Sequence, residues 1–468
     1  YECRITDSEN GVFLKRLRLS NFKAWKSLDI TFGSVTGFFG TNSSGKSSLL
    51  QFILMLKQTK NATDRGLVLD FGGPDQLVHL GAFKDVVNRH DENIAIDWSL
   101  KWEMPEAIKV IDPTGKRTDI LFESNEIEIK AQVALKRSSP VTNFLQYRFC
   151  NTGFGIVPRS EGSTKFGLKA DSDGGQTFQF IRTQGRVWDL PGPIKTHLFP
   201  DQAKTYYQNA DFLSDFEVAY EKLMDRIFYL GPLREYPKRE YQWAGARPED
   251  VGRRGERVVD AILAATLRNE TRNLGFKTRR RPFQEMIAYW LNELGLISDF
   301  KIAEIAKDSN LYQARVKRDQ HSAEALLTDV GFGVSQVLPA LVLLYYVPEG
   351  SIVILEQPEI HLHPSVQSGL ADVILTASST RNLQVIVESH SEHMLRRFQR
   401  RIAEEKYSSA DAKMFFVGQD KGDASLNDLK LNLFGEIENW PENFFGDELG
   451  EIAAIRAAAL RRRMKAAS

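Results

Sequence analysis

Cysteine, net charge and long hydrophobic runs are what this sequence has little of. Only two of its 468 residues are cysteines, Cys3 and Cys150, too few for a disulfide framework or a cysteine-rich zinc site, so a reducing cytoplasm is the expected location. Lysine and arginine number 61, and so do aspartate and glutamate. This balance excludes a globally basic nucleic-acid binder and an acidic tail, and it leaves only local basic surfaces.

No segment has the composition of a membrane anchor. The longest apolar run, Val337–Val347, contains Pro339 and is about half as long as the roughly 20 residues that cross a bilayer. The opening residues lack the charged, apolar and small-residue order of a signal peptide. What the chain does have is 42% hydrophobic and 26% charged residues, which is typical of a globular protein with a large core.

The hydrophobic pattern changes along the chain and divides it into four stretches. These are strands and one amphipathic helix over residues 1–90, alternating β-type segments over 91–200, helical spacing over 201–327, and an α/β rhythm over 328–468. We therefore expect an α/β fold in which both chain ends form one unit, with a β-rich and then a helical insertion. Within the insertions the pattern predicts strands at 127–131 and 177–181 and helices at 212–226, 256–268 and 282–294.

Residues 40–47 read Gly-Thr-Asn-Ser-Ser-Gly-Lys-Ser and satisfy the phosphate-loop pattern G-x-x-x-x-G-K-[ST]. The required context is present, since the apolar strand Val35–Phe39 precedes the loop and the amphipathic helix Ser47–Lys57 follows it. The glycines let backbone N–H groups point at phosphate oxygens, Lys46 supplies a charge to the β and γ phosphates, and the Ser47 hydroxyl can ligate Mg²⁺. ATP and Mg²⁺ are the predicted ligands, because the chain has no Asn-Lys-x-Asp segment for guanine.

A second apolar strand, Ser351–Leu355, ends in Glu356-Gln357-Pro358-Glu359. A carboxylate at the end of a buried parallel strand can hold Mg²⁺, directly or through water, so Glu356 is the predicted metal-side acid. The next position, where a water-activating glutamate often sits, is Gln357, whose amide can orient water but cannot take its proton at neutral pH. Glu359 is the alternative base, and the pattern predicts slow hydrolysis.

Two further segments complete the set. The apolar strand Asn382–Val387 ends in Glu388-Ser389-His390, and a histidine at such a strand tip can contact a γ-phosphate and sense its loss. Gly331 and Gly333 lie in a loop directly before an apolar helix, and a glycine loop at a helix N-terminus is an anion-binding device.

The histidines also allow a zinc reading. His361 and His363 form one pair, and His390 and His393 form another. Both pairs fall beside strand ends that the nucleotide site already explains, and no cysteine pair supports them, so Mg²⁺ is favoured as the only metal.

The order of these elements is phosphate loop, glycine signature, acidic strand and histidine switch, and it resembles the ABC-type ATPase heads of SMC, RecF and OLD-like proteins. Residues 17–25 look like the first strand of such heads. More closely, the chain resembles the bacterial "AAA family ATPase" group of OLD-like proteins of anti-phage defence systems. The matching segments are 229–234, 331–336, 356–364, 388–393 and 439–445.

The resemblance implies an ATP sandwich, in which two heads bind two nucleotides and each phosphate loop faces the partner's signature loop. It assigns nucleotide contacts to Gly40, Asn42, Ser44, Gly45, Lys46, Ser47 and Ser48, and trans contacts to Gly331, Gly333 and Ser335. It makes His390 the switch and assigns the metal to Ser47, Glu356 and Gln76. Two positions depart from the pattern: Gly331 stands where many heads carry the signature serine, and Gln357 replaces the commonest catalytic glutamate.

The same resemblance implies a function. It predicts a switch that forms a homodimer or higher oligomer around ATP and controls a separately encoded effector, often a nuclease, in bacterial anti-phage defence. The sequence between Lys46 and Glu356 has the pattern of a globular region, whereas SMC-like heads have a long coiled coil at this place. The alternative is a DNA-repair or recombination ATPase of the RecF kind, for which the arginine-rich stretches 268–281, 396–401 and 456–465 would meet DNA phosphates. A transporter ATPase is disfavoured by the lack of a membrane segment.

Overall fold

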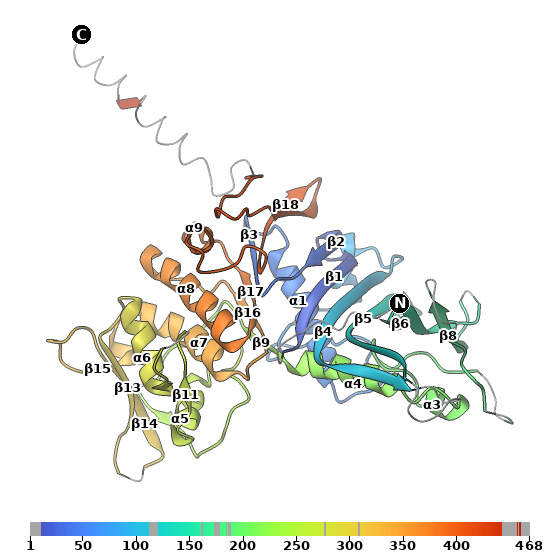
Figure 1. Ribbon diagram of the computed structural model, residues 1–468, viewed down its shortest axis with the longest axis horizontal. Coiled ribbons are helices and arrows are strands. Elements are labelled where there is room, and N and C mark those ends of the chain that lie inside the picture. The colour runs from blue at the N-terminus through green and yellow to red at the C-terminus, as the bar shows by residue number, and fades with distance from the viewer. Residues whose placement is uncertain are drawn as a thin grey trace.

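The computed structural model describes residues 11–111, 120–160, 162–172, 178–183, 185, 189–275, 278–307, 309–441, 456, 458 and 459. Figure 1 shows a central sheet with an all-β lobe and α4 on one side and most of the helices on the other. None of the helices in these residues is both long and apolar enough to cross a membrane.

The central sheet has six strands in the order β19-β18-β3-β17-β16-β9. Their bounds are β3 Val35–Gly40, β9 Ile227–Leu230, β16 Ile352–Glu356, β17 Gln384–Glu388, β18 Ala412–Asp420 and β19 Asp423–Leu429. All neighbours run parallel except β18 and β19. Because β3 from the N-terminal part pairs with β17 and β18 from the C-terminal part, both chain ends build one α/β unit, as predicted.

Helices cover both faces of this sheet, and the alternation of side chains along β16 assigns each face. Ile352 and Ile354 join the core that contains α1 (Lys46–Asn61) and α4 (Leu213–Asp225). Val353 and Leu355 join the opposite core, which contains α7 (Phe332–Tyr346), α8 (Pro364–Arg381) and α9 (Glu392–Ala403). A strand buried on both faces is therefore apolar throughout, which explains the continuous hydrophobic runs in the sequence.

A second, antiparallel sheet forms the all-β lobe, in the order β2-β1-β4-β5-β6-β7-β8. Its strands are β1 Phe13–Phe22, β2 Trp25–Thr31, β4 Ile96–Ile111, β5 Ile120–Lys136, β6 Ser139–Phe149, β7 Thr152–Pro158 and β8 Phe166–Ser172. Strand β1 pairs with β4, with Leu17 opposite Leu100, so this sheet crosses the boundary that we expected at residue 91. The expected strand 127–131 lies within β5, whereas residues 178–181 lie in no strand and Thr177 lies outside the described residues.

The stretch expected to be helical, 201–327, contains the expected helices but also strands. The helices are α4, α5 (Val258–Leu267) and α6 (Phe283–Glu293). Its strand β9 belongs to the central sheet, and β10 (Tyr241–Gln242), β13 (Asp299–Glu304), β14 (Leu311–Lys317) and β15 (Ala325–Leu326) form a small sheet. The helical pattern therefore predicted the helices of this stretch and missed its strands, because these strands are short and their pairing is not local. The remaining short elements are α2 Phe83–Val86, α3 Gln202–Tyr206, β11 Thr271–Arg272, β12 Arg281–Pro282 and 3₁₀ turns at Asn88–His90 and Leu327–Asp329.

Gly40, which ends β3 and begins the phosphate loop, has no room for a side chain. Its φ is +142°, and a Cβ would lie 2.1 Å from the carbonyl oxygen of Val417 on β18. We expect Gly40→Ala to lower the free energy of unfolding by about 3 kcal/mol or more, because neither backbone can move freely. Urea denaturation measures this loss.

Gly331→Ala is the matched control for Gly40→Ala. Nothing lies within 4 Å of a Cβ at Gly331, whose φ is −59°. The control is expected to change the free energy of unfolding by less than about 0.5 kcal/mol. Equal losses in the two variants would contradict the packing seen at Gly40.

Candidate functional site

The phosphate loop connects β3 to α1 and is held in a fixed conformation. Lys46 is buried, and its Nζ donates to the carbonyl oxygens of Gly40 at 3.0 Å and Thr41 at 2.6 Å. Gly45 adopts a φ of +102°, and its carbonyl accepts a hydrogen bond of 3.1 Å from Trp25 on β2. The loop therefore leads directly into the N-terminus of α1, where free backbone N–H groups favour an anion.

Three buried carboxylates lie at the same edge of the sheet as this loop. Glu388 ends β17, Glu356 ends β16, and Glu359 follows three residues later. The strands β3, β17 and β16 are adjacent and parallel, so the residues that follow them meet at one edge. The hydroxyl of Ser47 donates to Oε1 of Glu388 at 2.9 Å, which joins the phosphate loop to the acids directly.

Each of the other two carboxylates has a dedicated donor. The phenol of Tyr229, on β9, donates to Oε2 of Glu356 at 2.5 Å. The backbone N–H of His390 donates to Oε1 of Glu359 at 2.6 Å. Burial, and then the charge of Glu356, raises the pKa of Tyr229 well above its usual range, so its phenol remains a donor.

The crowding of acids changes their protonation. Burial first, and then the charge of Glu356, raise the pKa of Glu388 to about 7 against the opposing effects of Ser47 and Lys46. Burial also raises the pKa of Glu359, and the N–H of His390 opposes that shift. Each of these two carboxylates keeps one unsatisfied oxygen, because Oε2 of Glu388 and Oε2 of Glu359 are buried without a hydrogen-bond partner among the described residues.

The raised pKa of Glu388 makes the stability of the nucleotide-free protein pH-dependent. Between about pH 4.5 and pH 7 the folded protein holds a proton that the unfolded chain has released, so its free energy of unfolding falls as the pH rises. Glu388→Gln removes this titration. The free energy of unfolding of the variant is expected to exceed that of wild type by about 1–3 kcal/mol above pH 7 and to equal it below pH 4.5. Urea midpoints across this pH range measure the difference, and a pH-independent difference would contradict the assignment.

The structure brings most of the predicted site residues together. Lys46 and Ser47 lie beside Glu388, and Ser44 is buried with its Oγ 3.5 Å from Nζ of Lys46. His390 lies near enough to the loop to be affected by it. Burial lowers the pKa of His390, the charge of Lys46 lowers it further, and the carbonyl of Gly40 opposes the shift. Gln357 has the unusual φ of +44°, and its N–H donates to the carbonyl of Glu388 at 2.8 Å. Asn42 is exposed in the loop, and Ser48 is half-buried in the first turn of α1.

Four predicted residues lie apart from this cluster. Gln76 is on an exposed turn, where its Oε1 accepts from the N–H of Gly73 at 2.7 Å. Gly331, Gly333 and Ser335 lie at the N-terminus of α7, on the opposite side of the central sheet from α1 (Figure 1). No hydrogen bond in the described part of the chain joins these four to the phosphate loop, so their nucleotide contacts stay predictions.

Sequence reasoning missed three residues of the site. Glu388 was seen only as the end of an apolar strand, although an acid in that position is the same signal that identified Glu356. Tyr229 and Arg234 were seen only as part of a matching segment. Arg234 follows β9 and lies near enough to the acids for their charge to act on it: burial lowers its pKa, to about 10, against the opposing charges of Glu356 and Glu359.

The donors at this edge fit Mg²⁺ better than zinc. The Ser47 hydroxyl and the carboxylates of Glu356 and Glu388 are hard oxygen ligands, and Mg²⁺ typically takes one or two carboxylates together with phosphate oxygens and water. Across the residues that the structure describes, no three His, Cys, Asp or Glu side chains are grouped to hold a metal on their own. His363 instead caps α8, with its Nδ1 2.9 Å from Oγ of Ser365.

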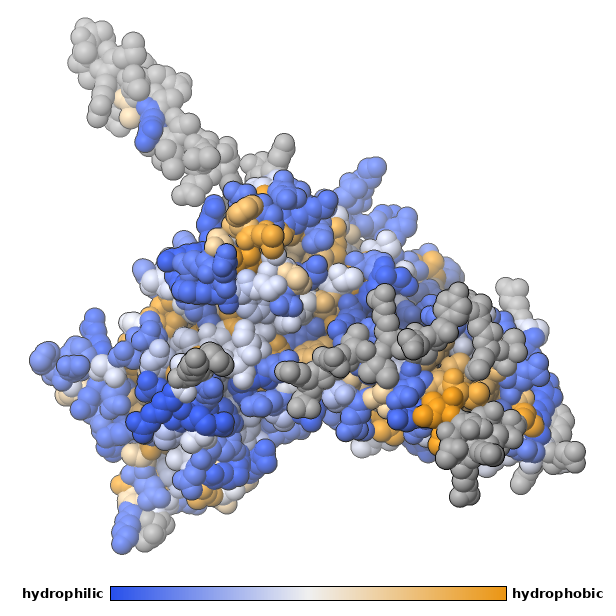
Figure 2. Space-filling view, in the orientation of Figure 1, coloured by the Kyte–Doolittle hydropathy of each residue, from blue (hydrophilic) through white to orange (hydrophobic). Residues whose placement is uncertain are grey.

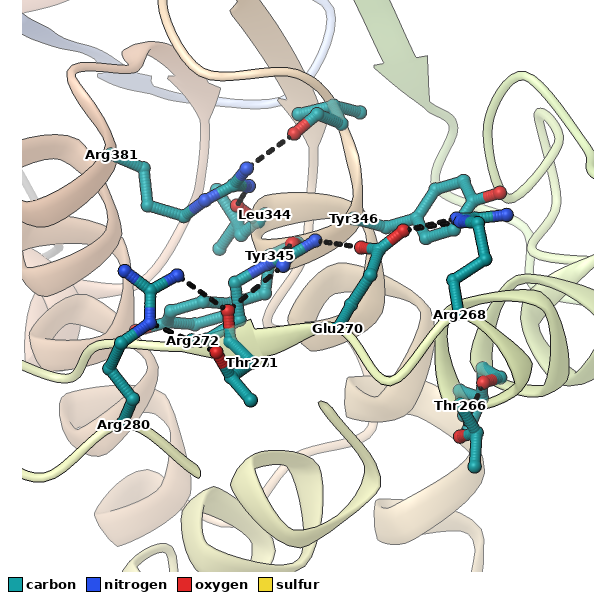
Figure 3. Close-up of polar contacts among 12 residues, drawn as sticks. Thr266, Arg268, Glu270, Thr271, Arg272, Arg280, Leu344, Tyr345, Tyr346 and Arg381 are labelled. Carbon is teal, nitrogen blue, oxygen red and sulfur yellow. Dashed lines mark hydrogen bonds and ion pairs between the residues drawn. The ribbon is translucent and has the colours of Figure 1, made fainter. Parts of the chain in front are cut away.

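Three arginines of the stretch 268–281 serve the fold. Figure 3 shows Arg268 and Arg272 turned toward Tyr345 and Tyr346 at the C-terminal end of α7, and Arg280 beside Thr271. Nε of Arg272 donates to the carbonyl of Tyr345 at 2.7 Å, Arg268 and Arg272 both pair with Glu270, and Arg280 donates to Thr271. Cations at a helix C-terminus are stabilised by the unpaired carbonyls there. The surface of this lobe is largely hydrophilic (Figure 2), but these guanidinium groups are occupied.

The basic stretch 396–401 gives little free charge either. Arg397 and Arg401 pair with Asp372, and Arg396 and Arg400 pair with glutamates one turn away on α9. Of the expected C-terminal basic residues, Arg461, Arg462, Arg463 and Lys465 lie outside the described residues.

A phosphate loop after one central strand, acids at the ends of the next two and a histidine beyond them define a P-loop ATPase fold assembled from both parts of the chain. A family model described as "AAA ATPase domain" matches residues 13–149 and 266–395, more than half of the sequence. The chain belongs to this family. A second model, described as a protein of unknown function (DUF3696), matches residues 408–455. The comparison with curated proteins finds no match.

Solved structures of SMC heads are similar to this chain at low identity. The SmcHead bound to the C-winged helix domain of ScpA has 13% identity and a TM-score of 0.41, covering 90% of this chain and 98% of that one. The SMC head domain from Thermotoga maritima has 10% identity and a TM-score of 0.38, covering 89% and 99%. A Pyrococcus furiosus Smc head with an extended coiled coil, bound to the C-terminal domain of ScpA, has 11% identity and a TM-score of 0.41, covering 90% and 97%.

Proposed function

We propose that the protein is a cytoplasmic switch that binds ATP with Mg²⁺ and hydrolyses it slowly. The observation that carries this proposal is the hydrogen bond from Ser47 of the phosphate loop to Glu388, beside Glu356 and Glu359. It joins the phosphate-binding and acidic parts of the site across the central sheet. Burying three carboxylates together is unfavourable without cations, so their presence here favours a site built to receive charge.

The residues divide the chemistry of hydrolysis among them. Lys46 and the N–H groups at the start of α1 bind the β and γ phosphates. Ser47, Glu356 and Glu388 would hold Mg²⁺, which when bound neutralises charge on the phosphates. Glu359, fixed through Oε1 by His390, presents Oε2 to the water.

The proton balance of the reaction then follows. The water oxygen bonds to the γ phosphorus, the bond to the β–γ bridging oxygen breaks, and Oε2 of Glu359 takes the proton of the water. Gln357 would orient the water and would not accept its proton.

The wider role rests on the position of the signature loop. Gly331, Gly333 and Ser335 are on the far side of the sheet from their own phosphate loop, which favours a second copy as the source of these contacts. A homodimer or higher oligomer around ATP would control a separately encoded effector, such as a nuclease, in bacterial anti-phage defence. The RecF-like alternative, direct DNA binding, has less support because most arginines of the described basic stretches are already paired.

Affinity capture with wild type and Lys46→Ala tests this role. We expect the product of a neighbouring gene to copurify with wild type and to be gained or lost when ATP is added, and Lys46→Ala to show no response to ATP. Salt-dependent binding of duplex DNA without a protein partner would instead favour the DNA-repair alternative.

A further inference from the structure

Arg234 lies in a loop that follows β9, the outermost parallel strand of the central sheet. Two backbone hydrogen bonds anchor this loop. The N–H of Gly231 donates to the carbonyl oxygen of Arg253 at 2.8 Å, and the N–H of Glu235 donates to the carbonyl oxygen of Arg254 at 2.9 Å. Its neighbours Leu233 and Tyr236 are 68% and 73% exposed. The loop therefore turns its apolar side chains outward and its cation inward.

The guanidinium group of Arg234 is partly buried and has nitrogens without a hydrogen-bond acceptor in the described part of the chain. Its Nε and Nη1 are buried and have no hydrogen-bond partner among the described residues. Oε2 of Glu359, whose charge acts on this guanidinium, is buried without a partner as well. Unpaired buried groups of opposite charge are costly in the free protein, and they indicate a site whose last component is a ligand.

Arg381 shows what a structural arginine does in this fold. It is more deeply buried than Arg234, and its Nη1 and Nη2 donate to the carbonyls of Leu344 and Val347 at 2.8 and 2.7 Å (Figure 3), which leaves only its Nε without a partner among the described residues. That contact caps the end of α7. No such backbone carbonyl takes Nε or Nη1 of Arg234 in the part of the chain described.

The strand order places Arg234 and Lys46 at opposite ends of the acidic cluster. Lys46 follows β3, the three glutamates follow β17 and β16, and Arg234 follows β9, which is the order of these strands in the sheet. When Lys46 binds phosphate, its charge is shared with the nucleotide. Arg234 is then the protein cation that still compensates the acids on the side away from the phosphate loop.

We propose that Arg234 is a positioning residue for hydrolysis, a cation at the far end of the acidic cluster that orients the unpaired oxygen of Glu359 toward the attacking water. The inference rests on the proposed ATPase function and adds to it. Because Arg234 follows β9, which two strands separate from β3 and its phosphate loop, we expect it to act on the rate of the chemical step and to leave nucleotide binding unchanged.

Steady-state ATPase kinetics and ATP binding of Arg234→Gln and Arg234→Lys test the proposal. We expect kcat to fall about 10- to 100-fold in Arg234→Gln, while the Kd for ATP stays within about threefold of wild type. Arg234→Lys keeps the charge and is expected to retain more of the rate. Guanidinium ion is expected to restore part of kcat in Arg234→Ala. The matched control is Arg239→Gln, five residues further along, whose exposed ion pair with Asp329 involves none of the three acids.

The outcomes separate this inference from the proposed function. An unchanged kcat in Arg234→Gln, with an active wild type, overturns the role of Arg234 alone. The role of Arg234 is also overturned if the substitutions reduce stability, ATP affinity and kcat together, and if neither Arg234→Lys nor added guanidinium ion restores kcat. That result would show a structural role. A wild type that neither binds nor hydrolyses ATP would overturn the proposed function itself.

Discussion

Lys46→Ala is expected to weaken ATP binding at least about 100-fold and to reduce hydrolysis to background. The ammonium group is buried at the base of the phosphate loop, held by the carbonyls of Gly40 and Thr41, where it faces the site without competing solvent. A charge-assisted contact to phosphate in such a place contributes more than a neutral hydrogen bond. Isothermal titration with ATP and Mg²⁺ measures the loss.

The matched control for Lys46→Ala is Lys60→Ala. Lys60 lies near the other end of α1, where its Nζ pairs with Asp225 at 2.6 Å. It should leave ATP affinity unchanged. ATP binding of Lys46→Ala at wild-type affinity would contradict the assignment of the loop.

Glu359→Gln is expected to lower kcat about 10²- to 10⁴-fold while ATP binding persists. The neutral amide keeps the shape of the side chain and its contact with the N–H of His390, but it cannot accept a proton from water. Gln357→Ala is expected to lower kcat less than about tenfold, because that side chain only orients the water. Rapid-quench measurement of phosphate release distinguishes the two.

The opposite ranking would identify Gln357 as the residue that governs the water. Glu349→Gln is the control for the loss of a carboxylate, since Glu349 is exposed at the other end of β16. It should leave kcat unchanged.

Local patterns allowed much of the fold and the phosphate side of the site to be predicted. The helix expected at 47–57 is α1, and those expected at 212–226, 256–268 and 282–294 are α4, α5 and α6 with ends shifted by a few residues. Apolar spacing over three or four turns depends only on neighbouring residues, so one sequence reveals it. The phosphate loop is visible for the same reason.

Contacts between distant parts of the chain could not be predicted in this way. Ser47 and Glu388 are 341 residues apart, and four-residue β9 has no pattern that indicates its pairing with β16. The same limit explains why the stretch that contains Arg272 could be assigned to DNA phosphates under the RecF-like alternative, since the partner of Arg272, Tyr345, lies 73 residues away. Such pairings depend on the tertiary fold, which no window of sequence contains.

The central claim is that both parts of the chain build one triphosphate pocket and that a second copy completes it. Mass photometry of wild type with and without a non-hydrolysable ATP analogue and Mg²⁺ tests this claim directly. The account predicts that the nucleotide doubles the mass of the particle and that Lys46→Ala, under the same conditions, keeps its nucleotide-free mass. A wild-type mass that does not change with nucleotide, while the analogue demonstrably binds, would contradict it.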